Sequence, residues 1–383
     1  MSGERTARQG AGEVLDLGRP QGATGPFTGG PLLEVRDLRV RFTRGGRPVH
    51  AVNGLSYTLN AGEILAIIGE SGSGKSVSTR SLMGLLPPSA EVSGSARFEG
   101  TELIGMPEKQ MRSWRGAKIA MVFQDPARSL NPTMRIGAQI TEAIRAHKKV
   151  SKKEAAERAV ELLKLVHLPA AERRFYEYPH QLSGGMRQRV VIAIALAGEP
   201  RLLIADEATT ALDVTTQAQI MELLVELQQR LGTAIIMISH DLGLAASYAH
   251  KVVVMYAGRA VEYATAEKLF ANVRMPYTQA LLGAIPLLDR KTHETLPVIP
   301  GQPPDPAALP KGCAFRPRCA SATDKCLEAP VLEEHEPGHW WACWHPAEKK
   351  DAAAPAGARD GEARVGGAPA AQVTDRVKDG AGR

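Results

Sequence analysis

Long apolar runs are missing from this sequence of 383 residues. Its most apolar stretch lies between Val190 and Ala197 and ends at Gly198, well short of the roughly 18 apolar residues that a membrane-spanning helix needs. The first residues, MSGERTARQG, lack the apolar segment of a secretory signal. We therefore expect a chain that does not span a membrane and stays in the cytosol.

Strong charge imbalance, internal repeats and abundant cysteine are missing as well. The 47 basic and 41 acidic residues leave a net charge of +6, far from the concentrated basic field of a dedicated nucleic-acid-binding protein. Hydrophobic residues make up 44% and charged residues 23%, which excludes a wholly disordered chain and a collagen-like repeat. At roughly 150 residues per domain, the length suggests two domains plus tails.

Short apolar runs alternate with helical patterns through most of the chain, which is typical of a parallel α/β sheet. Continuous apolar runs, as expected of strands buried on both faces, occupy residues 64–69, 119–123, 202–206, 234–239 and 252–256. Residues 32–42 and 50–59 alternate apolar and polar side chains, which favours an antiparallel sheet with one solvated face. Ser151 and Glu154 form a capping-box pattern at the start of a helix.

Composition divides the chain into four parts. Residues 1–30 and 347–383 are rich in small and polar residues without periodicity and are predicted to be disordered tails. Residues 31–285 are predicted to form a nucleotide-binding domain with a helical subdomain at about 126–185. A proline-rich linker leads into a C-terminal region, 286–346, that contains every cysteine.

A phosphate-binding pattern follows the first apolar run. The sequence GESGSGKS fits G-x-x-x-x-G-K-[ST] between a strand and a helix expected over residues 76–86. Its glycines let backbone N–H groups surround phosphates at a helix N-terminus. Lys75 is placed to reach the β- and γ-phosphates, and the Ser76 hydroxyl to ligate Mg²⁺. The candidate nucleotide-binding residues here are Gly69, Glu70, Ser71, Gly72, Ser73, Gly74, Lys75 and Ser76.

Two carboxylates follow a later apolar strand. Asp206 and Glu207 lie at the carboxyl end of the run 202–206, where ligands of open α/β sheets gather. Asp206 is a candidate ligand of Mg²⁺, and Glu207 is placed to polarise an attacking water. An acidic pair after a strand can also cap a helix, so this pair alone decides nothing.

The segment LSGGM, residues 182–186, resembles the signature of the ABC transporter ATPases. Gln124 resembles the Q-loop of this family, residues 210–213 its D-loop and His240 its switch histidine. The order and spacing of these elements with the two nucleotide motifs carry the resemblance. It implies an α/β fold: an ABC-type P-loop domain with a parallel core sheet, an antiparallel β subdomain and a helical subdomain, followed by a small C-terminal cysteine-containing domain.

The resemblance also implies a mechanism in which two ATPase domains clamp two ATP molecules head to tail. Ser183, Gly184 and Gly185 would contact the γ-phosphate of nucleotide bound to the partner ATPase. The implied catalytic residues are Glu207, His240 and Gln124, and the implied ligands of Mg²⁺ are Ser76, Gln124 and Asp206. Phe42 lies where the family has an adenine-stacking aromatic, although ordinary sheet packing explains it nearly as well.

Longer stretches resemble the first ATPase subunit of the bacterial oligopeptide and dipeptide importers. They are residues 124–132, 180–196, 202–224, 276–282, 299–304 and 312–319. The resemblance implies a peripheral subunit on the cytoplasmic face of the membrane that powers peptide import. Its implied partners are a second, non-identical ATPase, two permease subunits and an extracytoplasmic peptide-binding protein. Nickel importers use the same ATPase type, so the cargo stays open.

The four cysteines, Cys313, Cys319, Cys326 and Cys343, lie in one short segment. Without a secretory signal, a metal or cluster site is a better interpretation than two disulfides. Their spacing is unlike the paired cysteines of zinc fingers, and four thiolates suit an iron–sulfur cluster equally well. Resemblance to the importer subunits implies a [4Fe–4S] cluster held by all four, with Zn²⁺ and free thiols as alternatives.

Other protein classes fit the sequence less well. A translation factor of the ABC type usually has two cassettes and a repair ATPase a long coiled-coil insertion, and neither is visible here. A cysteine-rich nucleic-acid-binding module needs a basic, aromatic surface. Tryptophans 340, 341 and 344 offer part of one, but Glu333, Glu334 and Glu336 dilute it. We therefore expect no nucleic-acid partner.

Overall fold

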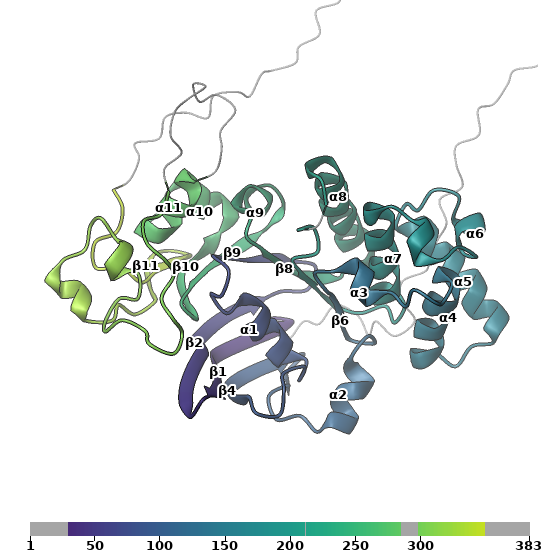
Figure 1. Ribbon diagram of the computed structural model, residues 1–383, viewed down its shortest axis with the longest axis horizontal. Coiled ribbons are helices and arrows are strands. Elements are labelled where there is room, and N and C mark those ends of the chain that lie inside the picture. The colour runs from purple at the N-terminus through teal and green to yellow at the C-terminus, as the bar shows by residue number, and fades with distance from the viewer. Residues whose placement is uncertain (1–29, 211, 285–297, 349–383) are drawn as a thin grey trace, which may run out of the picture. The chain divides into compact units, whose positions relative to one another are not determined.

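The computed structural model describes residues 30–210, 212–284 and 298–348 (Figure 1). The tails predicted for 1–30 and 347–383 fall almost entirely outside these residues. Of the proline-rich linker predicted for residues 297–310, only residue 297 lies outside them. Among the described residues, no helix has both the length and the apolar composition needed to cross a membrane.

A four-stranded antiparallel sheet contains the alternating segments near the N-terminus. Its strand order is β2-β1-β4-β5. The strands are β1 (Leu33–Arg44), β2 (Arg47–Leu59), β4 (Glu91–Phe98) and β5 (Thr101–Glu102). Alternate residues such as Leu55, Tyr57 and Leu59 are buried, so one face of the sheet packs and the other meets solvent. The antiparallel sheet predicted from the alternation is confirmed.

A second sheet has eight strands in the order β11-β12-β10-β9-β3-β8-β7-β6. The strands are β3 (Ile64–Ile68), β6 (Ile119–Val122), β7 (Leu202–Asp206), β8 (Ala234–Ser239), β9 (Lys251–Tyr256), β10 (Arg259–Thr265), β11 (Glu333–Glu336) and β12 (His339–Trp341). Neighbours from β9 to β6 pair in parallel, whereas β10, β12 and β11 add antiparallel strands. This pairing confirms the predicted parallel core. Its strands are the continuous apolar runs of the sequence, which can be buried on both faces.

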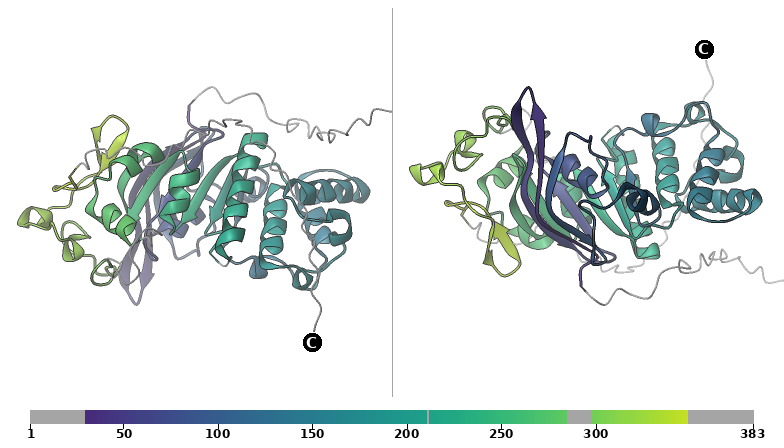
Figure 2. Two further views of the ribbon diagram at one scale, coloured as in Figure 1. Left: turned by 90° about the horizontal axis from the view of Figure 1, so that it is seen from above. Right: turned by 90° about the horizontal axis from the view of Figure 1, so that it is seen from below.

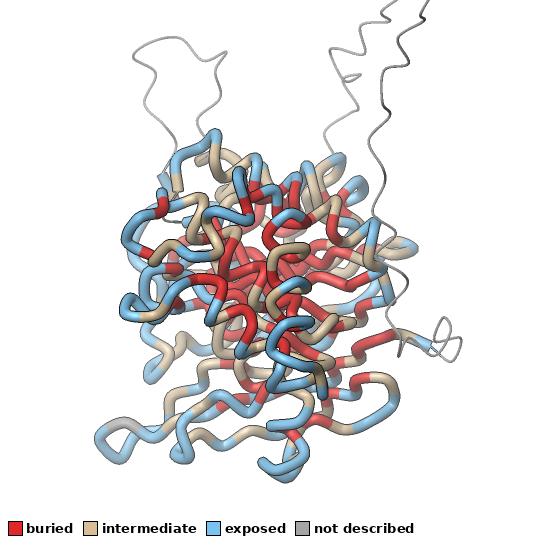
Figure 3. Tube along the Cα trace, turned by 90° about the vertical axis from the view of Figure 1, so that its right-hand side faces the viewer, coloured by how far each residue is buried: buried red, intermediate tan, exposed pale blue. Residues whose placement is uncertain are grey.

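The two faces of the eight-stranded sheet pack against different layers. Along β3, Ile64, Ala66 and Ile68 join one core, and Leu65 and Ile67 join the other. Helices cover the first face, whereas the antiparallel sheet covers the second (Figures 1 and 2). The buried residues follow the strands through the middle of the molecule (Figure 3).

The helices vary in length, and the longest lie on the first face. They are α1 (Lys75–Leu82), α2 (Glu108–Trp114), α3 (Pro126–Ser129), α4 (Ile136–His147), α5 (Lys152–Leu165), α6 (Ala171–Arg174), α7 (Gly184–Leu196), α8 (Val214–Leu231), α9 (Leu242–Tyr248), α10 (Ala266–Ala271) and α11 (Pro276–Gly283). Ser151 and Glu154 make the predicted capping box of α5. Helices α4, α5 and α7 pack together beside β6. Helices α4 and α5 lie within the segment 126–185 that is predicted to be a helical subdomain, whereas α7 begins at the end of that segment.

The helix after the phosphate loop is shorter than predicted. It ends at Leu82 rather than near residue 86. Gly84 has φ of 59°, a left-handed conformation that favours glycine, and the N–H of Leu85 bonds back to the carbonyl of Arg80. This turn closes the helix before the prolines at 87 and 88 are reached.

The cysteine segment extends the eight-stranded sheet. Strand β12 pairs with β10, and β11 pairs with β12 at the edge. Two short 3₁₀ turns, η2 (Arg316–Arg318) and η3 (Asp324–Leu327), lie between residue 298 and strand β11. The yellow segment in Figure 1 therefore lies beside β10 and α11.

Candidate functional site

The loop between β3 and α1 needs glycine at two of its positions. Gly69 and Gly74 have φ of 148° and 97°. A Cβ atom at Gly69 would lie 2.2 Å from the carbonyl oxygen of Met255, and one at Gly74 would lie 2.3 Å from that of Ala51. Any side chain at either position would collide with backbone. The pattern G-x-x-x-x-G-K-S is thus fixed by the close approach of neighbouring strands.

Lys75 folds back over this loop. Its ammonium donates to the carbonyl oxygens of Gly69, at 2.7 Å, and Glu70, at 2.9 Å. Only 5% of the residue is exposed, and this desolvation lowers the pKa of Lys75, while Glu207, Asp206 and Glu70 act in the opposite direction. Three carboxylates therefore help to keep a buried ammonium charged.

Asp206 lies at the end of β7 and contacts helix α1. Asp206 is 1% exposed. The Ser76 hydroxyl donates to Oδ1 at 2.6 Å, and Arg80 Nη2 donates to Oδ2 at 3.0 Å. The structure thus joins the predicted magnesium ligands Ser76 and Asp206. Sequence reasoning missed Arg80, although its position one helical turn after Ser76 places both on one face of α1.

Glu207 stands in an unusual backbone conformation. Its φ is 50°, and its N–H bonds to the carbonyl of Ile238 at 3.1 Å. The Gln124 side-chain amide donates to Glu207 Oε2 at 2.8 Å. A non-glycine residue rarely adopts positive φ, and it keeps this conformation only where the surrounding structure holds it. The backbone of Glu207 is therefore fixed by its neighbours. The predicted Gln124 and Glu207 lie in direct contact, across 83 residues of sequence.

Within the described part of the chain, no hydrogen bond or ion pair joins His240 or Phe42 to this group. His240 follows β8, the strand beside β7, and is exposed. Phe42 lies in β1, is half-buried and packs against the core of the antiparallel sheet. Their assigned roles stay predictions.

The signature segment begins helix α7 at an exposed end. Ser183 is the N-cap, and its Oγ accepts from the N–H of Met186 at 3.3 Å. Gly184 is exposed, and a Cβ at Gly185 would lie 2.5 Å from Thr216 Cγ2. The helix N-terminus is thus open to a second molecule. Of the predicted D-loop, Ala211 lies outside the described residues, and Asp213 caps α8.

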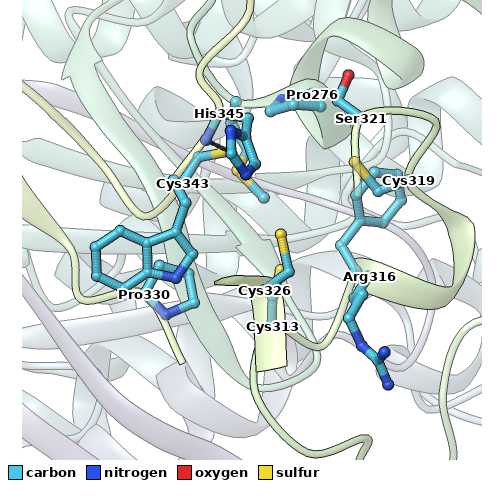
Figure 4. Close-up of a pocket in the computed structure, with 12 residues that line it drawn as sticks. Pro276, Cys313, Arg316, Cys319, Ser321, Cys326, Pro330, Cys343 and His345 are labelled. Atoms are coloured by element: carbon cyan, nitrogen blue, oxygen red, sulfur yellow. Dashed lines mark hydrogen bonds between the residues drawn. The ribbon is translucent and has the colours of Figure 1, made fainter. Parts of the chain in front are cut away.

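The four cysteines line one small cavity (Figure 4). Cys326 is buried and the other three are half-buried. Among the described residues, no group of three or more His, Cys, Asp or Glu side chains is placed closely enough to hold a metal ion. The structure therefore brings the predicted ligands to a common cavity, with their sulfur atoms directed inward, without closing a metal site.

Burial makes three of the thiols, those of Cys313, Cys319 and Cys343, poor acids. Desolvation raises the pKa of Cys313 and Cys319, and neighbouring cysteines act in the same direction. It raises the pKa of Cys343 to about 11. Without a cation, the protonated form is favoured at neutral pH, so metal binding would have to displace protons.

Solved structures place this fold in a class. The dimeric ATP-binding cassette MJ0796, in a post-hydrolysis state bound to ADP and Pi, superposes with a TM-score of 0.55 at 28% identity, covering 61% of this chain and 98% of that one. The cbiO1 protein of Clostridium perfringens, part of an ABC transporter complex, gives a TM-score of 0.55 at 32% identity, over 63% and 91% of the two chains. The fold and the phosphate loop are those of an ABC ATPase.

Sequence comparisons specify the family. The ABC transporter family model matches residues 52–210, and the model for the oligopeptide/dipeptide transporter C-terminal region matches residues 261–326. The oligopeptide transport ATP-binding protein OppD of Salmonella typhimurium is 53% identical over 83% of this chain and 95% of its own length. The dipeptide transport ATP-binding protein DppD of Lactococcus lactis is 50% identical over 82% and 90%. The chain belongs to the ABC transporter ATPases that carry an oligopeptide-transporter C-terminal region.

Proposed function

We propose that this chain is the first-type ATP-hydrolysing subunit of an ABC importer for oligopeptides or dipeptides. The observation that carries the proposal is the 53% identity to OppD over 83% of the chain, which includes both the cassette and the C-terminal region. Relatives named for oligopeptide and for dipeptide transport match about equally well. Peptides are therefore the favoured cargo class.

The phosphate loop and Lys75 would bind the nucleotide of this chain. The Ser73 hydroxyl is buried and, within the described part of the chain, has no hydrogen-bond partner. A bound phosphate would supply the missing acceptor. Lys75 would exchange its two carbonyl contacts for phosphate oxygens, which are stronger acceptors for an ammonium group.

Ser76 and Asp206 fit a magnesium site, with Gln124 as a third candidate. Oxygen donors from a hydroxyl and a carboxylate lie in contact, and these are donors that Mg²⁺ prefers. When bound, the ion would neutralise charge on the phosphates. Glu207 would accept a proton from the attacking water, Gln124 would orient that carboxylate, and His240 would contact the γ-phosphate region.

Partners follow from the exposed signature segment. Ser183, Gly184 and Gly185 would meet the γ-phosphate held by a second, non-identical ATPase, since an open helix N-terminus is suited to an anion. We further propose two permease subunits and an extracytoplasmic binding protein as partners, with this chain at the cytoplasmic face of the membrane. Residues 31–285, with a helical subdomain at about 126–185, would form the ATPase domain, and 286–346 the C-terminal region.

The cysteine site would hold a [4Fe–4S] cluster. The support is chemical: four thiols line one cavity, and four thiolates are the usual ligands of such a cluster. Anaerobically purified protein should be brown and should lose that colour in Cys319→Ser. One zinc and no iron per chain by elemental analysis would contradict the cluster.

Transport by the complete complex tests the function. The chain should be purified with its partner ATPase and permeases, placed in proteoliposomes and supplied with the binding protein. We expect labelled peptide uptake that requires ATP and is lost in Glu207→Gln. Uptake of Ni²⁺ without uptake of peptides would contradict the peptide cargo.

A further inference from the structure

An ion pair between a buried arginine and a half-buried glutamate joins the cysteine segment to the phosphate loop. Arg318 Nη1 donates to Glu70 Oε2 at 2.6 Å, and Nη2 donates to Oε1 at 3.0 Å. The arginine side chain is 5% exposed, and its other bonds go to the Pro300 carbonyl and the Tyr256 hydroxyl. Such a two-point contact fixes both distance and orientation. Arg318 precedes Cys319, and Glu70 is the second residue of the phosphate loop.

Every polar group of Glu70 has a partner in this arrangement. Its N–H donates to the Tyr277 hydroxyl at 2.9 Å, and its carbonyl accepts from Lys75 Nζ at 2.9 Å. Its carboxylate is held by Arg318. Moving Glu70 would therefore change the position of the lysine that is proposed to bind phosphate.

The turn that holds Arg318 is tied to two cysteines. The N–H of Arg316 bonds to the Cys313 carbonyl at 3.1 Å, and the N–H of Cys319 bonds to the Arg316 carbonyl at 3.3 Å. Phe315, in the same turn, packs against Tyr256 and Tyr277 with ring centroids 5.3 Å from each. A displacement of Cys313 or Cys319 would therefore move the guanidinium with it.

We propose that Arg318 is a positioning residue that holds the phosphate loop through Glu70 and so couples the cysteine site to nucleotide binding. The inference rests on the proposed nucleotide-binding role of residues 69–76. Coupling between two sites is reciprocal. The state of the thiols changes nucleotide affinity, and bound nucleotide changes the mobility of the cysteine turn.

Affinity for a non-hydrolysable ATP analogue with Mg²⁺ tests the contact in the full-length chain. We expect binding about tenfold weaker in Arg318→Gln and in Glu70→Gln, with no further loss in the double variant. Arg318→Lys should be intermediate, because an ammonium cannot make two parallel bonds. Arg316→Gln removes the same charge from the same turn, and its guanidinium points away from the cysteine sulfurs in Figure 4, so its affinity should stay within about twofold.

Thiol labelling tests the reverse direction. In metal-free, reduced protein, the nucleotide analogue should slow alkylation of Cys319 about tenfold, measured by mass spectrometry, and should have no effect in Arg318→Gln. If Arg318→Gln does not fold, Glu70→Gln breaks the same contact from the other side.

Two results overturn the coupling. One is wild-type nucleotide affinity in Arg318→Gln and Glu70→Gln; the other is nucleotide-independent labelling in the wild type. A wild-type chain that binds no nucleotide would contradict the proposed function itself, which is a different result.

Discussion

The ATP site and the cysteine segment are held in place in different ways. Around the phosphate loop, strands β3, β7 and β8 are buried at every residue, so the loop ends are fixed by two apolar cores. Within residues 298–348, the buried hydrophobic residues are Phe315, Cys326, Trp341 and Ala342. Regular structure there amounts to two short strands and two 3₁₀ turns. Strands packed in two cores position the first region, whereas pairing at one sheet edge and individual side-chain contacts position the second.

This difference predicts different consequences of mutation. A substitution at the ATP site should change chemistry and leave the fold intact, because the cores carry the stability. A substitution at a contact of the cysteine segment should change stability or coupling and leave the reacting groups unchanged. The predictions below test this contrast.

Glu207→Gln should give the largest effect. Removing the carboxylate that accepts a proton from water should slow ATP hydrolysis on the order of 10³-fold, with ATP affinity retained, and should trap an ATP-loaded dimer with the partner ATPase. Phosphate release and size-exclusion chromatography measure the two effects. Glu222→Gln, an exposed position on α8, is the matched control. Normal turnover in Glu207→Gln would remove this residue from the mechanism.

Lys75→Ala should weaken nucleotide binding on the order of a hundredfold, because two charge-assisted bonds to phosphate would be lost. Its melting temperature should stay close to that of the wild type, since the strands that flank the loop are unchanged. Titration calorimetry measures the affinity, with the exposed Lys109→Ala as control. Equal affinities would refute the assignment of Lys75.

Glu262→Ala should destabilise the attachment of the C-terminal region. The Glu262 carboxylate is fully buried and accepts from the N–H of Arg274 at 2.7 Å and from that of Met275 at 3.3 Å, and it pairs with His339 at 2.9 Å. Removing it leaves buried donors unpaired, which costs about 3 kcal/mol. Urea unfolding measures this.

The exposed Glu333→Ala is the control for this stability change and should remain within about 0.5 kcal/mol of the wild type. A loss of similar size in both variants would contradict the anchoring role of Glu262.

High pH should give the smallest effect. In metal-free protein, burial and the neighbouring thiols raise the pKa of Cys343 to about 11, from 9.0 for an ordinary thiol. The folded chain therefore keeps a proton that the unfolded chain releases, so stability falls as pH rises from about 9 to 11 and is unaffected by this group below pH 9. Melting temperatures of wild type and Cys343→Ser should diverge over that window, with the larger decrease in the wild type. Parallel curves would contradict the raised pKa.

Local signals in the sequence were sufficient for much of the fold. The strands at 202–206 and 234–239 appear with the predicted bounds, because the short length of these apolar runs and the turn residues that flank them favour buried strands over helices. The end of α1 was misplaced because prolines at 87 and 88 were more conspicuous than Gly84, whose left-handed backbone closes the helix.

Contacts between distant segments could not be predicted in the same way. The family resemblance assigned Gln124 and Glu207 to one nucleotide site, and the structure brings the two side chains into contact after the neighbouring strands β6 and β7. Arg318 and Glu70 are 248 positions apart, and neither lies in a pattern that refers to the other. Only the packing of the C-terminal region against α11 and β9 brings them together.

Strand β11, at the outer edge of the eight-stranded sheet, has a further consequence for assembly. Its sequence is Glu-Glu-His-Glu, and Glu333 and Glu334 are exposed. A free edge can add a strand from another chain and so begin aggregation, and closely spaced negative charges oppose that addition. Extension of the core sheet by the cysteine segment thus ends in an electrostatic barrier. We therefore expect the proposed partner ATPase to bind at surfaces such as the open N-terminus of α7 rather than at this edge.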